Sequence, residues 1–207
     1  MTVDVSGVTK PGKRARSKAA NRRAILDAGR RVFARIGFEA TTVRDIIRET
    51  DLAAGTFYNY FKSKEEVFEA IAEDSTHRFR YLLKDVRESA RTPEDYMRDA
   101  YGAYFSFIAG ENVKAIRENA PHIALIGVRV DTPEMLAVAA EIRSDLERIL
   151  AADTSSNLDI DYLTAAAIGI AREMGEVMLM RRPVDAEGAA EFASRMLMAG
   201  VRALAAK

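Results

Sequence analysis

The chain contains no cysteine and no tryptophan, and only two of its 207 residues are histidines. The absence of cysteine excludes disulfides, thiolate metal sites and cysteine nucleophiles, and two histidines alone do not supply a plausible zinc ligand set. The first ten residues lack the apolar stretch of a secretory signal, and no apolar run approaches the roughly 20 residues of a membrane-spanning helix. We therefore expect a cytoplasmic protein with no cofactor, no metal and no membrane partner.

Strand-like alternation of apolar and polar residues is also absent, whereas apolar residues recur at helical spacing along most of the chain. The five prolines fall between these segments and not inside them. The pattern predicts an all-α fold of about nine helices. Their expected ranges are about 17–36, 42–50, 53–60, 63–89, 92–110, 111–127, 132–152, 159–182 and 185–206.

Four helix starts carry recognisable capping signals. Ser63 and Glu66 have the spacing of a capping box, in which the serine hydroxyl and the glutamate satisfy backbone amides at the helix start. Thr92 and Thr132 each precede Pro-Glu, which is typical of an N-cap, a first-position proline and an acidic first turn. Thr41 or Thr42 is expected to cap the second helix.

The net charge of zero hides a strong asymmetry. Residues 1–64 contain 14 Lys and Arg against 6 Asp and Glu, a net charge of +8, so the rest of the chain carries −8. Such asymmetry favours a polyanionic partner for the basic segment. Seven basic residues lie between Asp4 and Asp27 without an acidic one, and we expect residues 1–20 to form a flexible basic arm that follows phosphates or reaches a minor groove.

The segment 42–61 has the pattern of a helix-turn-helix. Two short helices joined at Asp51-Leu52 each turn apolar residues inward, and Phe57 and Phe61 are spaced to share the buried face of the second helix. Thr56, Tyr58 and the neighbouring 59–60 are then left on its surface. Polar and aromatic groups on an exposed short helix suit insertion into a DNA major groove.

The residues from Asn21 to Ile71 resemble the tetracycline-repressor-type (TetR) family of bacterial regulators. The resemblance rests on Ala24-Ile-Leu-Asp-Ala28, on Thr41-Thr-Val-Arg-Asp-Ile46, and above all on Gly55, Tyr58, Phe61 and Lys64 within Gly55-Thr-Phe-Tyr-Asn-Tyr-Phe-Lys-Ser-Lys-Glu65. It implies a DNA-binding domain at 21–70 and a helical ligand-binding and dimerisation domain at 71–207. The alanines at 53 and 54 depart from the family pattern, so the recognition helix is expected to lack a side-chain cap.

The resemblance also implies roles for individual residues. Tyr58 and Lys64 correspond to phosphate contacts, and Thr56 corresponds to a base contact. Together with the basic arm, the predicted DNA-binding residues are Thr42, Arg44, Thr56, Tyr58, Asn59, Tyr60, Lys64, Arg14, Arg16 and Lys18. The expected partner is a palindromic double-stranded operator, because a two-fold dimer places two recognition helices about one DNA turn apart, roughly 34–36 Å.

The C-terminal half is rich in aromatic residues and methionine, which usually form core but also suit irregular apolar pockets. The resemblance implies a cavity there for a small apolar or amphipathic effector. The candidate lining residues are Tyr101, Tyr104, Phe105, Ile108, His122, Met135, Glu173, Met174 and Met178. Small residues crowd the last two helices, and the resemblance implies that these helices form the homodimer interface.

The sequence contains no enzyme motif in its required structural context. Tyr60 and Lys64 match a Tyr-x-x-x-Lys pair, but no glycine-rich strand-to-helix turn or alternating strand pattern accompanies it. We expect no catalysis and favour a ligand-released repressor. The alternatives are an activator or an effector-independent regulator, and, more distantly, a helical small-molecule carrier or enzyme with an incidental basic segment.

Overall fold

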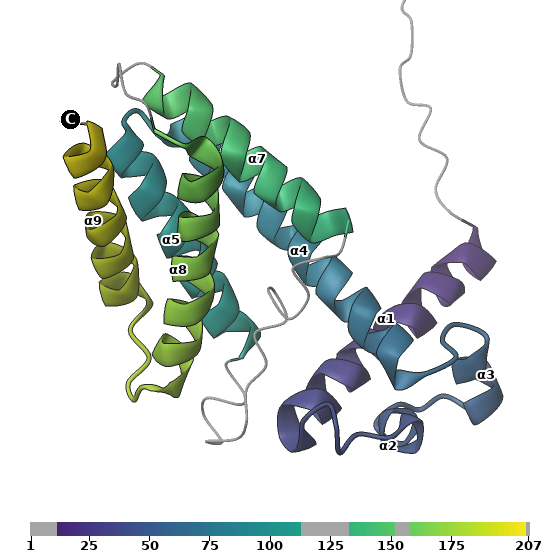
Figure 1. The fold of residues 1–207 in the computed structure, drawn as a ribbon. Helices are drawn as coiled ribbons and strands as arrows, with labels where there is room; N and C mark the ends of the chain where they lie inside the picture. The colour runs from purple at the N-terminus through teal and green to yellow at the C-terminus, as the bar shows by residue number, and fades with distance from the viewer. Residues whose placement is uncertain (1–11, 113–132, 152–157, 206–207) are drawn as a thin grey trace, which may run out of the picture. The chain divides into compact units, whose positions relative to one another are not determined.

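The computed structural model describes residues 12–112, 133–151 and 158–205. These residues form eight α-helices and no strand, as Figure 1 shows, which confirms the predicted all-α class. The helix predicted at 111–127 lies almost entirely outside the described residues, and so does His122. The chain divides into two compact units, Met1–Ala70 and Ile71–Lys207.

The first unit contains α1 (Lys13–Ile36), α2 (Val43–Arg48), α3 (Ala54–Tyr58) and the start of α4 (Lys64–Ser89). Residues 13–20, which were predicted to belong to a flexible basic arm, are instead helical, because α1 begins at Lys13. The reason is local: this segment consists of lysine, arginine, alanine and one serine, and all but the serine are strong helix formers. Periodicity of apolar residues, on which the prediction relied, carries no signal there.

Aromatic rings pack helix α1 against helix α4 within the first unit. The Phe33 and Phe68 rings meet edge to face with centroids 5.5 Å apart, and Phe38 lies 4.9 Å from Phe68 and 5.6 Å from Phe33. Glu49, at the end of α2, accepts hydrogen bonds from Arg31 at 2.8 Å and Arg35 at 3.1 Å, which ties α2 to α1. The small core of the first unit is thus stabilised by aromatic packing in its interior and by ion pairs at its surface.

The second unit contains the rest of α4 together with α5 (Pro93–Glu111), α7 (Pro133–Leu150), α8 (Ile160–Met180) and α9 (Ala186–Ala205). Helix α5 packs against α9, α8 and α7. Helices α4 and α7 run side by side (Figure 1) and are joined by ion pairs from Arg80 to Glu141 and from Arg87 to Asp145. The core of this unit is therefore built around α5.

Helix ends follow the capping signals closely. Thr42 and Asp45 form a reciprocal capping box on α2, and the hydroxyl of Thr92 accepts a hydrogen bond from the amide of Asp95 at 3.0 Å. The Ser63 hydroxyl accepts the Glu66 amide at 3.3 Å, whereas the Glu66 carboxylate reaches the amide of Lys62 and not that of Ser63. None of the described helices combines the length and apolar character needed to span a membrane.

Gly175 marks a close approach of α8 to α5. A side-chain carbon built at this position meets the Ile108 Cδ1 atom at 2.7 Å and the Tyr104 ring at 3.2 Å. Any larger residue must therefore push these side chains away. The glycine allows α8 to lie directly on the aromatic face of α5.

Candidate functional site

The N-terminus of α2 is a closed polar cap on the surface of the first unit. The Thr42 hydroxyl accepts the Asp45 amide at 3.3 Å and donates to the Asp45 carboxylate at 2.6 Å, and the Thr42 amide donates to the same carboxylate at 3.0 Å. The hydrogen bond from the Thr42 hydroxyl is the main cause that lowers the pKa of Asp45 below its ordinary value. Arg44, one residue into the helix, is exposed.

Helix α3 turns one residue inward and leaves the others at the surface. The side chain of Phe57 is 1% exposed, whereas its neighbour Tyr58 is 57% exposed and meets it edge to face with centroids 5.5 Å apart. Asn59 is exposed, and Thr56 and Tyr60 are partly exposed. The N-cap residue Ala53 makes no side-chain hydrogen bond, as expected from its alanine. The helix thus presents a hydroxyl, a phenol and an amide to solvent.

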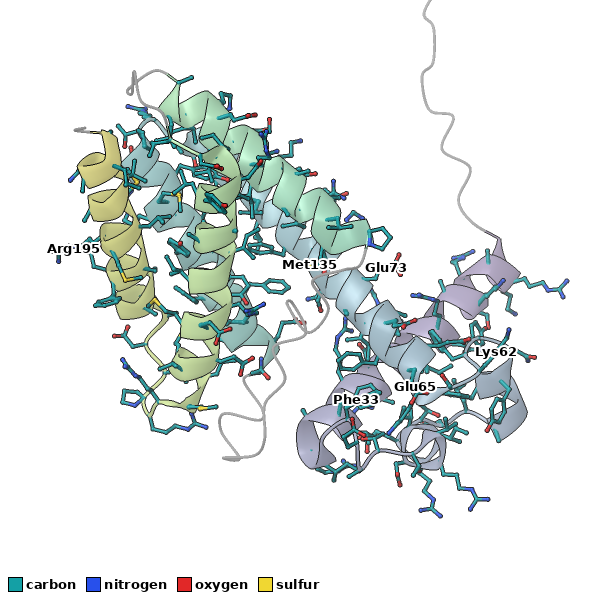
Figure 2. The ribbon with its side chains drawn as sticks, in the orientation of Figure 1. Phe33, Lys62, Glu65, Glu73, Met135 and Arg195 are labelled. Atoms are coloured by element: carbon teal, nitrogen blue, oxygen red, sulfur yellow. The ribbon has the colours of Figure 1, made fainter. Side chains whose placement is uncertain are left out.

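Lys64 has a structural contact that the sequence does not reveal. Its ammonium donates to the backbone oxygens of Phe38 at 2.9 Å and Glu39 at 3.1 Å, and lies 4.5 Å from the centre of the Phe38 ring. This cation therefore secures the loop after α1. Lys62, two residues earlier and labelled in Figure 2, is exposed and is a cation beside α3 that the sequence analysis did not select.

Comparison with known proteins agrees with this geometry. Residues 25–71 match the family model of bacterial regulatory proteins of the tetR family. The transcriptional regulator TcmR of Streptomyces glaucescens is 27% identical over 172 residues, which cover 81% of this chain and 75% of TcmR. Residues 25–71 therefore form a domain of the TetR family, and these matches support a transcriptional regulator of that family.

Solved structures share the fold of this TetR-family regulator along most of its length. The fatty acid degradation regulator FadR from Bacillus halodurans aligns with a TM-score of 0.69 at 18% identity, over 94% of this chain and 99% of that one. FadR from Bacillus subtilis, solved in complex with stearoyl-CoA, aligns with a TM-score of 0.68 at 18% identity, over 86% of this chain and 98% of that one. The predicted resemblance is thereby confirmed, and the chain is a transcriptional regulator of the TetR type.

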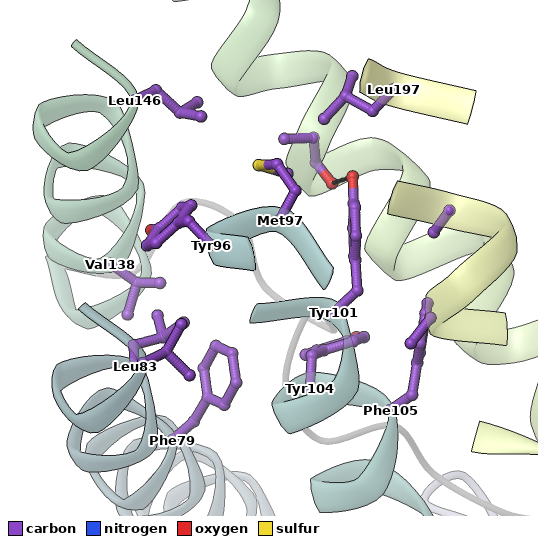
Figure 3. Packing of buried hydrophobic residues seen from close by; sticks show 14 of the residues in the cluster. Phe79, Leu83, Tyr96, Met97, Tyr101, Tyr104, Phe105, Val138, Leu146 and Leu197 are labelled. Carbon is purple, nitrogen blue, oxygen red and sulfur yellow. Dashed lines mark hydrogen bonds between the residues drawn. The ribbon is translucent and has the colours of Figure 1, made fainter. Parts of the chain in front are cut away.

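The second unit of this regulator contains an apolar cavity between α4, α5, α7 and α8. The volume of this cavity is about 80 Å³. Figure 3 shows Phe79, Leu83 and Val138 on one side of this region and Tyr101 and Tyr104 on the other. The remaining lining residues are Tyr96, Met97, Ala100, Met135, Ile142, Ala167, Ile168, Ala171 and Arg172.

Three of the predicted ligand residues line this cavity, namely Tyr101, Tyr104 and Met135. Phe105, Ile108 and Met178 belong instead to the surrounding buried core, and Met174 packs against that core. Glu173 is exposed and pairs with Arg172 at 2.9 Å. Phe79 and Leu83 were missed, although their spacing of four residues on α4 is the signal that would have placed them on one face.

The tyrosines of the cavity wall are largely committed to the protein. The Tyr101 hydroxyl donates to the backbone oxygen of Ala167 at 3.2 Å, and the Tyr96 hydroxyl donates to Asp145 at 3.0 Å. Asp145, which is 3% exposed, also accepts from Arg87 at 2.6 Å. Burial is the main cause that raises the pKa of Tyr96, Tyr101 and Tyr104, the last to about 12. Apart from Arg172, the side chains of the wall are therefore apolar or neutral at neutral pH.

Helices α8 and α9 also carry large apolar side chains on their outer faces. Tyr162 and Met180 of α8 are 78% and 69% exposed, and Phe192 and Met196 of α9 are 62% and 45% exposed. Ala199, Gly200 and Ala203 follow along the exposed side of α9. An apolar surface of this kind, flanked by small residues, is typical of a protein interface.

Proposed function

We propose that this TetR-type regulator is a homodimeric repressor that binds a palindromic operator and is released from it by a small apolar or amphipathic effector. The observation that carries the proposal is the split within α3, where Phe57 anchors the helix in the core and Tyr58 stands beside it at the surface. A short helix fixed in this way holds base-reading groups in a defined orientation.

On the DNA side, Thr56 contacts a base edge, and Tyr58 and Asn59 contact phosphates or bases beside it. Arg44 on α2 adds a charge-assisted contact, and Thr42 and Tyr60 border the same surface. Contacts to phosphate fix the register of the protein on the duplex, while the few contacts to bases select the sequence. Lys64 supports this surface through its hold on the loop at 38–39, and any phosphate contact that it makes uses the same ammonium.

On the effector side, the ligand enters the cavity against Tyr101, Tyr104 and Met135. The apolar lining favours a body of hydrocarbon or aromatic character, and Arg172 suits a single polar or anionic end. The related FadR of Bacillus subtilis, solved with stearoyl-CoA, is a relative that binds an amphipathic molecule of this type. We expect the effector of this chain to share that division into an apolar body and a polar end.

The dimer forms through the outer faces of α8 and α9. Tyr162, Met180, Phe192 and Met196 supply the large side chains, and the small residues of α9 allow close approach of the partner helix. Two-fold pairing then presents two copies of α3 to one operator. The effector shifts the equilibrium between two dimer states by its difference in affinity for them, typically about 1–3 kcal/mol.

Binding of the full-length chain to a library of random duplexes tests the DNA part of the proposal. Selection should yield a palindromic site, and its affinity should fall steeply with salt. Failure to bind any duplex at low salt contradicts the proposal.

A cavity-filling variant tests the effector part. Ala100→Leu places extra carbons in the cavity and should abolish the thermal stabilisation given by hydrophobic carboxylates such as decanoate. Leu82→Ala, on the exposed side of α4, is the matched control and should keep that stabilisation. Equal stabilisation of both variants rejects this cavity as the ligand site.

A further inference from the structure

The first turns of α1 extend beyond the core of their unit. Every residue from 13 to 20 is exposed, whereas the buried residues of α1 begin at Ile25. This stretch contains no acidic residue and is dominated by lysine, arginine and alanine. It is a projecting helix whose surface is determined almost entirely by its cations.

The cations of this helix fall on two faces. Arg14, Lys18 and Arg22 follow one another at intervals of four residues, so they form a single row along the helix. The same row continues into Ile25 and Gly29, which are buried in the core. The three cations therefore occupy the face of α1 that, further along the helix, packs onto the rest of the unit.

A contact at the edge of the core fixes the direction of this row. The Arg22 guanidinium lies 5.5 Å from the centre of the Phe61 ring, and Phe61 follows directly after α3. The row thus begins beside the helix-turn-helix and runs outward from it. Lys13, Arg16 and Arg23 lie on the other side of α1 by the same helical spacing.

We propose that Arg14, Lys18 and Arg22 form a rigid basic ridge that binds the phosphate backbone of duplex DNA next to the site of α3. The inference rests on the proposed DNA-binding function and adds a surface to it. Successive residues of the ridge are about 6 Å apart along the helix, and a DNA strand carries one phosphate every about 3.4 Å of its axis, so neighbouring cations reach different phosphates. The Arg22 guanidinium lies over the Phe61 ring, and a guanidinium held against a ring can still donate its N–H groups to phosphate.

A rigid ridge and a flexible arm differ in the charges that bind DNA and in the conformational entropy lost on binding. A flexible arm uses all its charges and loses conformational entropy when it binds, whereas a preformed helix uses only the charges on one face and has less freedom to lose. A rigid ridge therefore predicts that Arg14 and Lys18 contribute to DNA affinity and that Arg16 does not. A flexible arm predicts equal contributions from all three.

Two matched double variants of the full-length chain test this separation. Lys18→Ala/Arg22→Ala removes one lysine and one arginine from the ridge, and Lys13→Ala/Arg23→Ala removes the same charges from the other side. Affinity for a fluorescent 30-base-pair duplex of mixed sequence is measured over a series of salt concentrations. We expect the ridge variant to lower the slope of log affinity against log salt by about 1.8, or about 0.9 for each phosphate contact, with roughly a tenfold or greater loss of affinity near 0.1 M salt. The control should stay within about threefold of the original chain, and equal losses in the two variants overturn the ridge.

A helix-breaking variant tests rigidity while keeping every charge. Ala20→Pro disrupts the helix at its eighth residue, because proline clashes with the preceding turn and removes an amide donor. Ala20→Ser keeps the helix and serves as the control. We expect Ala20→Pro to bind as weakly as the ridge variant, and unchanged binding overturns the requirement for a helix.

The outcomes separate this inference from the function on which it rests. A chain that binds no duplex at any salt concentration rejects DNA binding altogether. A chain that binds, weakens on Tyr58→Phe and ignores Lys18→Ala/Arg22→Ala keeps the proposed function and loses the ridge.

Discussion

The two units of the molecule place the same residue type in opposite settings. Tyr58 of the first unit is 57% exposed on a five-residue helix, whereas Tyr101 of the second unit is 3% exposed and donates its hydroxyl to a backbone oxygen. An exposed phenol is available to an external partner. A buried phenol already donates its hydrogen bond within the protein, and it contributes mainly through the packing of its ring. Burial, more than residue identity, therefore assigns the chemistry of each tyrosine.

The ion pairs of the two units differ in the same way. Glu49 of the first unit joins Arg31 and Arg35, whose side chains are 41% and 49% exposed. Asp145 of the second unit is 3% exposed and receives hydrogen bonds from Arg87 and Tyr96. Exposed pairs contribute little to stability, whereas the loss of one member of a buried group leaves the others unsatisfied.

The largest expected effect follows from this contrast. Asp145→Ala should lower the free energy of unfolding by about 3–5 kcal/mol, because it leaves Arg87 and the Tyr96 hydroxyl without their buried acceptor. Glu49→Ala should lower it by about 1 kcal/mol or less. Urea unfolding followed by circular dichroism measures both, and similar losses for the two variants break the comparison.

The next effect concerns Lys64. The sequence predicts that it contacts phosphate, whereas in the structure it donates to the loop at 38–39. Lys64→Ala should destabilise the protein by about 1.5–3 kcal/mol, because its ammonium makes two charge-assisted hydrogen bonds to the loop at 38–39. Lys62→Ala, on the exposed neighbour, should change stability by no more than about 0.5 kcal/mol. Equal stability of the two variants in the same urea experiment assigns Lys64 no structural role.

A smaller pair of effects sharpens the contrast between the tyrosines. Tyr58→Phe should weaken binding to operator and random duplexes alike, by roughly tenfold near 0.1 M salt, because a hydrogen bond to a charged phosphate is lost. The salt slope should stay nearly unchanged, because a neutral phenol neutralises no phosphate charge. Its stability should stay within about 0.5 kcal/mol. Tyr101→Phe should do the reverse, losing about 1 kcal/mol of stability without a change in DNA affinity. A loss confined to the operator, with random duplexes bound as before, rejects the phosphate contact.

The smallest expected effect is a difference between the two units in how their stability depends on pH. In the first unit, hydrogen bonds from Thr42 and Arg31 lower the pKa of Asp45 and Glu49, so their contribution is present above the unfolded value of about 4 and is lost as the pH falls through the folded value. In the second unit, burial raises the pKa of Tyr104 to about 12, so its contribution is present below about 10 and is lost as the pH rises through about 12. Thermal unfolding from pH 2 to 12 should show the acid limb flattened by Asp45→Asn and the alkaline limb by Tyr104→Phe. The opposite assignment contradicts the structure.

The first unit was the more predictable from sequence because its signals are local. Thr42 and Ser63 cap helices where their spacing predicted, and the helical spacing of Phe57 and Phe61 predicted which side of α3 is buried. The start of α1 was misplaced because helix propensity, and not apolar periodicity, determines residues 13–20. The role of Lys64 was missed because its acceptors lie 25 and 26 residues away in the chain.

The cavity was less predictable because it depends on how helices cross. Tyr101 and Tyr104 line it while Phe105 belongs to the core beside them, and helical spacing alone does not separate these neighbours. The close crossing at Gly175 sets which face of α5 meets α8. A single glycine in the sequence does not announce such a crossing, since its partner side chains come from another helix.

The prior engagement of the tyrosine hydroxyls in the cavity wall has a consequence for how the regulator discriminates among compounds. The hydroxyls of Tyr96 and Tyr101 already donate their hydrogen bonds to acceptors within the protein. Recognition then relies mainly on fit, and one methylene more or less changes affinity by only about 1–3 kcal/mol. Under the proposed effector function, a homologous series should therefore bind with an affinity graded along its chain length, so that the cavity responds to a class of molecules and not to a single compound.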